Sequence, residues 1–213
     1  MKGEPLVCHR ISPLALAELF EALEALRASG RARVPDRKDG MLVPDAYPGS
    51  VVPLFIPGPS GELQAQECSW GFDAPSGARA KLVFNTRIET ALSQARSGTG
   101  LWSEAILRGR CLLPVRGFYE SWTRMPPRRG AQVRFTYPGH KVFLLAALYQ
   151  DGRCSVVTTE PNATVAPLHS RMPLVLGPGE SSIWLGQGFA SLIDRSGIIL
   201  DVEHDEEQPQ LSL

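Results

Sequence analysis

Four short segments of the chain contain residue types that could perform nucleophilic and acid–base chemistry. The first is Cys8-His9-Arg10. Cationic neighbours favour the thiolate form of a cysteine and lower its pKa, which would make Cys8 a nucleophile. A free cysteine is more often a small buried residue, here at the start of a strand. By itself, this segment favours the structural interpretation.

The second segment, residues 84–90, ends an apolar run and reads Phe-Asn-Thr-Arg-Ile-Glu-Thr. Thr86 and Glu89 have the spacing of a capping box, in which each side chain satisfies a backbone N–H at the start of a helix. Asn85 and Arg87 have no such explanation and would project from a strand–helix junction. Because a helix N-terminus attracts anions, Arg87 would suit a phosphate there.

The third segment, residues 117–122, reads Gly-Phe-Tyr-Glu-Ser-Trp. In a strand, Phe118, Glu120 and Trp122 share one face, so a carboxylate would lie between two large aromatic side chains. Such a conflict with simple patterning is typical of functional sites. Desolvation there would raise the pKa of Glu120 toward the range of a general acid. The weaker alternative is a solvent-facing glutamate between partly exposed aromatics.

The fourth segment is His169-Ser170-Arg171-Met172-Pro173, a polar loop that enters an apolar run. A single loop histidine means little by itself. Together with one cysteine, one asparagine and one glutamate, His169 completes an inventory that is sufficient for nucleophilic and acid–base chemistry.

Short strand-like runs dominate the elements that must position these segments. Ser12 and Pro13 are predicted to cap and begin a helix that ends at Gly30, and residues 89–108 and 180–185 also read as helices. Strands are predicted at residues 51–56, 63–72, 81–86, 111–122, 133–137, 142–150, 154–159 and 173–176. Strands outnumber helices without regular alternation, so we expect an α+β fold with a mostly antiparallel, barrel-like core and peripheral helices.

Size and composition favour one domain over residues 1–213, with 43% hydrophobic and 21% charged residues. No apolar run approaches the roughly 20 residues of a membrane span, and the N-terminus lacks a signal-peptide core, so we predict a cytoplasmic protein. The four cysteines lack metal-ligand spacing, which favours reduced thiols. No metal or nucleotide cofactor motif is visible.

The formal net charge of zero hides an asymmetry. Residues 201–213 contain five acidic side chains and no Lys or Arg, so the preceding residues carry a net charge of +5. A basic body with an acidic tail is compatible with nucleic-acid binding, although solvated loops are the default explanation. We hypothesise that the tail, residues 203–213, competes with DNA for a basic groove.

The four segments, in this order and spacing, resemble the SOS-response-associated peptidase family. Its members have a Cys-Gly-Arg start followed by Asn-Ala-Arg-x-Glu, Cys-Leu-x-Pro-x-x-Gly-Phe-Tyr-Glu-Trp and His-x-Arg-Met-Pro segments. The matching residues here are 8–10, 85–89, 111–120 and 169–173, and Trp70-Gly71 is similar to the family's Trp-Gly pair. The resemblance runs from residue 8 to about residue 176.

This resemblance implies a β-rich core with surrounding helices and a protein that traps the aldehyde of abasic sites in single-stranded DNA. The α-amine of an N-terminal cysteine condenses with the aldehyde, and the thiol then closes a thiazolidine ring. Cys8 would be the nucleophile, Asn85 would orient the reacting groups, and Glu120 and His169 would transfer protons.

The resemblance also implies DNA contacts. Arg10, Arg87 and Arg171 would hold phosphates, and Trp70 would stack on a base. We expect a nucleoid-associated monomer whose partner is single-stranded DNA with abasic sites, with no cofactor and no membrane contact.

Two departures from the family pattern affect the expected chemistry. Residues 1–7 precede Cys8, so its nitrogen is an amide that cannot form a Schiff base. Val7 could be an internally read GTG start codon, which we favour; alternatively, the chain cleaves itself before Cys8 or has lost cross-linking. His9 occupies the position of the usual glycine, where it would crowd the site or carry a proton.

Two further functions remain open from the sequence. One is a thiol hydrolase for peptide bonds, with Cys8 as the nucleophile and His169 as the base. The other is a non-catalytic module for single-stranded DNA, whose binding would survive Cys8→Ala and weaken steeply with salt.

Overall fold

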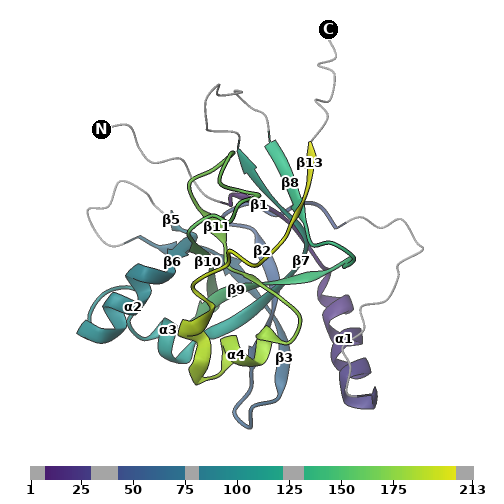
Figure 1. Ribbon diagram of the computed structural model, residues 1–213. Helices are drawn as coiled ribbons and strands as arrows, with labels where there is room; N and C mark the ends of the chain where they lie inside the picture. The colour runs from purple at the N-terminus through teal and green to yellow at the C-terminus, as the bar shows by residue number, and fades with distance from the viewer. Residues whose placement is uncertain (1–7, 30–42, 75–81, 122–131, 205–213) are drawn as a thin grey trace, which may run out of the picture.

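The computed structural model describes residues 8–29, 43–74, 82–121 and 132–204 (Figure 1). Its strands are β1 (Arg10–Pro13), β2 (Val51–Pro57), β3 (Leu63–Trp70), β4 (Phe72–Asp73), β5 (Leu82–Val83), β6 (Asn85–Arg87), β7 (Arg110–Ser121), β8 (Gln132–Thr136), β9 (Phe143–Gln150), β10 (Arg153–Thr159), β11 (Met172–Pro173), β12 (Val175–Leu176) and β13 (Asp201–His204). Its helices are α1 (Leu16–Ser29), α2 (Ile88–Ser97), α3 (Ala105–Arg108), α4 (Glu180–Leu185) and the 3-10 helix η1 (Gln187–Leu192).

Five strands form a closed barrel in the order β9–β10–β3–β2–β7, and β7 pairs with β9 to complete the ring. Strand β10 runs parallel to β3 and β6, whereas the remaining ladders among the described strands are antiparallel. The helices lie around the outside of this sheet (Figure 1). The predicted α+β fold with a mostly antiparallel barrel-like core is confirmed.

Strand β7 links the two ends of the barrel. Its residues 110–115 pair with β9, and its later residues pair with β1 on one side and β8 on the other. Leu113 and Val115 belong to the core inside the barrel, whereas Leu112 belongs to a second core that includes Trp184 of α4. Successive side chains therefore enter different cores, which explains why the strand is buried almost throughout.

The helix predicted to start at Ser12 begins later, at Leu16. Ser12 and Pro13 instead belong to β1, where they pair with Gly117 and Val115 of β7. Pairing along β7 overrides the local capping pattern. The first turn is closed by Glu18, whose carboxylate accepts the backbone N–H of Ala15 at 2.8 Å. The predicted end at Gly30 lies outside the described residues.

The single helix predicted at residues 89–108 is two helices, α2 and α3. Gly98 and Gly100 have φ values of 68° and 106°, a left-handed conformation that ends α2. The predicted capping box is also wrong. Arg87 is the N-cap residue without a side-chain cap, and the Thr86 hydroxyl lies 2.7 Å from the Ser155 hydroxyl in the adjacent strand.

The predicted acidic tail begins as a strand. Residues 201–204 form β13, which pairs with β8, and Glu203 forms a 2.6 Å ion pair with Arg134. Residues 205–213 lie outside the described residues, so the proposed competition with DNA stays a prediction. Among the described residues, no helix is long and apolar enough to cross a membrane.

Candidate functional site

Cys8 and Glu120 meet at the end of β7. The backbone N–H of Cys8 points at the carboxylate of Glu120, with 3.0 Å from the nitrogen to each carboxylate oxygen. Both residues are fully buried. Cys8 has φ of 38°, a left-handed conformation that is uncommon for a residue with a side chain. Strained backbone of this kind is often found at functional sites.

His169 brings a third titratable group to the same place. Its Nδ1 lies 4.0 Å from Oε2 of Glu120, and the side chains of both residues are fully buried. The same nitrogen lies 3.1 Å from the carbonyl oxygen and 3.2 Å from the backbone nitrogen of Arg171, which holds the ring in position. Three of the four predicted catalytic residues, Cys8, Glu120 and His169, are therefore neighbours.

Burial controls the protonation of this site. It raises the pKa of Glu120 well above its ordinary value, and the hydrogen bond from Cys8 offsets only part of that effect. Burial, followed by the nearby charge of Glu120, also raises the pKa of the Cys8 thiol well above its ordinary value. The predicted increase for Glu120 is confirmed. The lowered pKa that cationic neighbours would give the Cys8 thiol is not found, because burial first and the charge of Glu120 second act in the opposite direction.

Strand β10 joins the segments that carry Asn85 and His169. Its residues 156–158 pair with β6, which contains Asn85, and its residues 158–159 pair with β11 directly after the His169 loop. Thr158 pairs with both Arg87 and Pro173, so the two segments lie on opposite edges of β10. Asn85 is half-buried in β6, and the role predicted for it stays a prediction.

Arg171 connects the same two segments through side chains. Its guanidinium donates to both carboxylate oxygens of Glu89 in α2, at 3.1 and 2.9 Å, to Glu160 at 2.8 Å, and to the carbonyl of Thr158 at 2.9 Å. The residue is 7% exposed. A phosphate contact by Arg171 stays a prediction, and it would require the phosphate to displace two carboxylates from a buried guanidinium.

Trp70 does not offer a surface for a DNA base. It is fully buried in the barrel core, its indole N–H donates to the carbonyl of Phe84 at 2.9 Å, and its ring packs edge-on against Phe84 at 6.1 Å. The predicted stacking is wrong, because neither face of the ring is accessible. The Trp-Gly pair instead anchors the strand that leads to Asn85.

A polar network missed by the sequence analysis surrounds Arg10. Its Nε donates to Asp45 at 2.7 Å, its Nη1 donates to the side-chain oxygen of Gln132 at 2.7 Å, and its guanidinium lies 3.8 Å from the centre of the Tyr119 ring. Residues 10, 45, 119 and 132 come from distant parts of the chain, so no local pattern links them. Arg87, in contrast, is exposed beside the N-terminus of α2. Phosphate contacts by Arg10 and Arg87 stay predictions.

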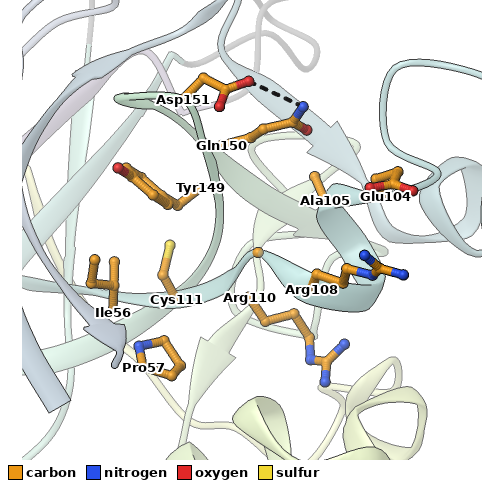
Figure 2. A pocket seen from close by; sticks show the side chains of 11 residues that line it. Ile56, Pro57, Glu104, Ala105, Arg108, Arg110, Cys111, Tyr149, Gln150 and Asp151 are labelled. Atoms are coloured by element: carbon orange, nitrogen blue, oxygen red, sulfur yellow. Dashed lines mark hydrogen bonds between the residues drawn. The ribbon is translucent and has the colours of Figure 1, made fainter. Parts of the chain in front are cut away.

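A separate pocket of about 400 Å³ lies at the other end of β7 (Figure 2). Its lining comes from the end of β2, the helix α3, the start of β7 and the end of β9, and includes Glu104, Arg108, Cys111 and Tyr149. It shares no residue with the Cys8 site, and roughly 30 Å of strand separates Cys111 from Glu120. Within the described residues, no group of three or more His, Cys, Asp or Glu side chains could hold a metal ion, and all four cysteines are free and buried.

A family model described as SOS response associated peptidase matches residues 10–205. The chain belongs to this family. The match begins two residues after Cys8 and covers β1 and the segments that contain Asn85, Glu120 and His169.

Two curated proteins of Bacillus subtilis are similar to this chain. Abasic site processing protein YoqW is 30% identical over 128 residues, which is 54% of this chain and 54% of the relative. Abasic site processing protein YoaM is 26% identical over 149 residues, which is 64% of this chain and 63% of the relative. The matched region thus spans roughly half to two thirds of these relatives.

Solved structures agree with the fold. A protein from Bacteroides thetaiotaomicron has a TM-score of 0.65 and 19% identity, covering 94% of this chain and 93% of the other. A protein from Bordetella bronchiseptica has a TM-score of 0.64 and 18% identity, covering 93% of this chain and all of the other. At such identities the similarity concerns the fold alone.

Proposed function

We propose that this protein processes abasic sites in single-stranded DNA by capturing the lesion's aldehyde covalently at Cys8. The observation that carries the proposal is the placement of the Cys8 nitrogen 3.0 Å from both oxygens of Glu120, in a buried site that also contains His169. The relatives named abasic site processing proteins support the same substrate.

The first step is attack of the free α-amine of Cys8 on the aldehyde carbon of the opened sugar. A carbinolamine forms, and loss of water gives an imine. A carboxylate adjacent to the nitrogen can accept the proton that the amine loses and return it to the departing hydroxyl. Glu120 suits both tasks because burial raises its pKa, so that it holds a proton more readily than an exposed glutamate does.

The second step closes the ring. The thiol sulfur of Cys8 adds to the imine carbon, the C=N electron pair returns to nitrogen, and the thiol proton is transferred to that nitrogen, which gives a thiazolidine. The raised pKa of the thiol keeps it protonated until the imine forms. His169, 4.0 Å from Glu120, is placed to relay protons during closure and reversal.

Capture requires that Cys8 have a free α-amine, so residues 1–7 must be absent or removed. Translation from Val7 and self-cleavage before Cys8 would each meet this requirement, and self-cleavage would account for the peptidase activity in the family's description. A general thiol hydrolase is a weaker proposal, because burial keeps the Cys8 thiol protonated and hydrolysis needs the thiolate.

The test compares the full chain with a chain that begins Met-Cys8, each mixed with single-stranded DNA that contains one abasic site and separated on a denaturing gel. We expect a shifted band with the shortened chain and none with its Cys8→Ala variant. A shifted band with the full chain as well, accompanied by a loss of mass equal to residues 1–7, would establish self-cleavage. No shifted band with either chain would overturn covalent capture and leave non-covalent DNA binding.

A further inference from the structure

His9 lies between the proposed nucleophile and Arg10, and the tautomer of its ring is determined by a hydrogen-bond relay. Arg10 can only donate, so the Gln132 atom that it contacts at 2.7 Å is the amide oxygen. The other end of that amide is therefore the NH2 group, which lies 2.8 Å from Nε2 of His9. Because an amide NH2 can only donate, Nε2 of His9 is the acceptor and the ring proton belongs on Nδ1.

The Nδ1–H of His9 is a buried donor with no hydrogen-bond partner among the described residues. Buried donors are almost always paired, so one without a partner beside a reactive residue needs an explanation. Burial and the adjacent charge of Arg10 lower the pKa of His9, which favours the neutral ring that this tautomer requires. The relay therefore holds one buried N–H without a partner on the residue that follows Cys8.

We propose that His9 is a substrate-binding residue whose Nδ1–H donates to an oxygen of the DNA strand captured at Cys8. This inference rests on the proposed function. A single strand with an abasic site offers oxygen acceptors around the lesion, both on the flanking phosphates and on the opened sugar. Asp45 anchors the relay by accepting from Arg10 at 2.7 Å and from Ser12 at 2.5 Å, so the donor is oriented before the DNA binds.

A matched pair of substitutions separates the two ring nitrogens. The amide nitrogen of Asn can occupy the position of Nδ1, so His9→Asn retains the donor and loses the contact with Gln132. The longer side chain of His9→Gln reaches the position of Nε2 and loses the donor. In the chain that begins Met-Cys8, we expect His9→Gln to slow capture about tenfold, as for the loss of one hydrogen bond. His9→Asn should restore capture to within about threefold of the parent chain.

His140 provides the control, since it is an exposed histidine whose Nδ1 contacts Pro138 in a turn. His140→Gln should not change capture. Equal melting temperatures for the three variants would exclude unfolding as the cause of slow capture. Equal capture rates for His9→Gln and the parent chain, or equally slow capture by His9→Asn and His9→Gln, would overturn the inference.

Two further measurements identify the acceptor and separate this inference from the proposed function. Nitrogen-15 NMR of the unliganded protein should show the proton of His9 on Nδ1; a proton on Nε2 would overturn the inference and leave the proposed function intact. Weaker binding of His9→Gln to DNA with a tetrahydrofuran analogue, which has no aldehyde, would identify a phosphate. A defect confined to capture of true abasic sites would identify a sugar oxygen. Failure of the parent chain to capture or bind the DNA would overturn both proposals.

Discussion

A titratable side chain lies near each end of β7, and the two side chains differ in how many hydrogen-bond partners they have. Arg110, at the start of the strand, donates to five carbonyl oxygens at the ends of α3 and α4 and lies 4.1 Å from the centre of the Phe189 ring. Glu120, near the other end, is fully buried and accepts the one N–H of Cys8, with His169 at 4.0 Å. All five N–H donors of Arg110 are used, so its guanidinium stabilises the helix ends. Glu120 has few partners, so its carboxyl group can still form hydrogen bonds during a reaction.

The same contrast explains which end carries the proposed chemistry. Arg110 has no donor left for a ligand, although it lines the pocket of Figure 2. Glu120 has unused acceptor capacity and a pKa raised by burial, so a change of its protonation state alters the site. We therefore assign the proposed chemistry to the sparsely partnered, buried Glu120 and not to the pocket.

The largest expected effect is that of Glu120→Gln on capture. The amide keeps the shape of the side chain and can still accept the N–H of Cys8, but it cannot take up a proton. In the chain that begins Met-Cys8, capture of an abasic site should slow about 10²- to 10⁴-fold. The rate is measured on denaturing gels, and unfolding in urea should show a free energy at least equal to that of the parent chain. Unchanged capture would remove Glu120 from the proposed mechanism.

The second effect concerns stability at the opposite end of β7. Arg110→Met retains the apolar stem but leaves the carbonyl oxygens of α3 and α4 without donors. The free energy of unfolding in urea should fall by about 1–3 kcal/mol, because the carbonyl oxygens that lose their donor are partly buried. Capture by the folded variant should remain within about twofold of the parent rate. A large loss of capture without a loss of stability would contradict the division of roles along β7.

The sequence predicts a role for Glu120 but none for Arg110, and this difference has a physical cause. Glu120 could be predicted because the alternation of a strand places it among apolar residues, a conflict that is visible within a few positions. The role of Arg110 could not be predicted, because its partners are main-chain carbonyl oxygens, which every residue has. Likewise, the barrel strands follow from apolar runs, but the role of Arg171 depends on Glu89, which is 82 positions away.

Local patterns failed where a distant strand competed for the same residues. Ser12 and Thr86 both have the sequence of helix caps, yet Ser12 pairs with β7 and Thr86 contacts Ser155 of β10. Trp70 belongs to a Trp-Gly pair that is similar to the family's, but such a similarity does not reveal burial, and the residue is in the core. The sequence therefore indicated which residues matter better than it indicated what they contact.

The third prediction concerns how the free energy of unfolding depends on pH, and it compares variants at the two ends of β7. Because burial raises the pKa of Glu120 in the folded state, its protonated form is favoured by folding, and this contribution is complete below the ordinary value of about 4.5. As the pH rises from that value through the raised pKa, the contribution is lost, at no more than about 1.4 kcal/mol per pH unit for one proton. Urea unfolding of the parent chain should show this decline above pH 4.5, and Glu120→Gln should remove that part of it. Arg110→Met should leave the slope unchanged. Identical slopes for the parent chain and Glu120→Gln would mean that the carboxyl group is not desolvated.

The smallest effect tests whether Arg171, which is paired with two carboxylates near Glu120, acts by positioning the His169 loop. Glu89→Gln removes the paired contact with Arg171 that ties α2 to the His169 loop, so capture should slow about threefold to tenfold. Glu160→Gln is the matched control, because Glu160 is 78% exposed and makes a single contact with the same guanidinium, at a cost expected to be below about 1 kcal/mol. A positioning role predicts slower chemistry with unchanged affinity for DNA that carries the non-reactive tetrahydrofuran analogue. Tighter binding of that DNA, more pronounced at low salt, would instead show that Arg171 contacts a phosphate when the charge of Glu89 is removed.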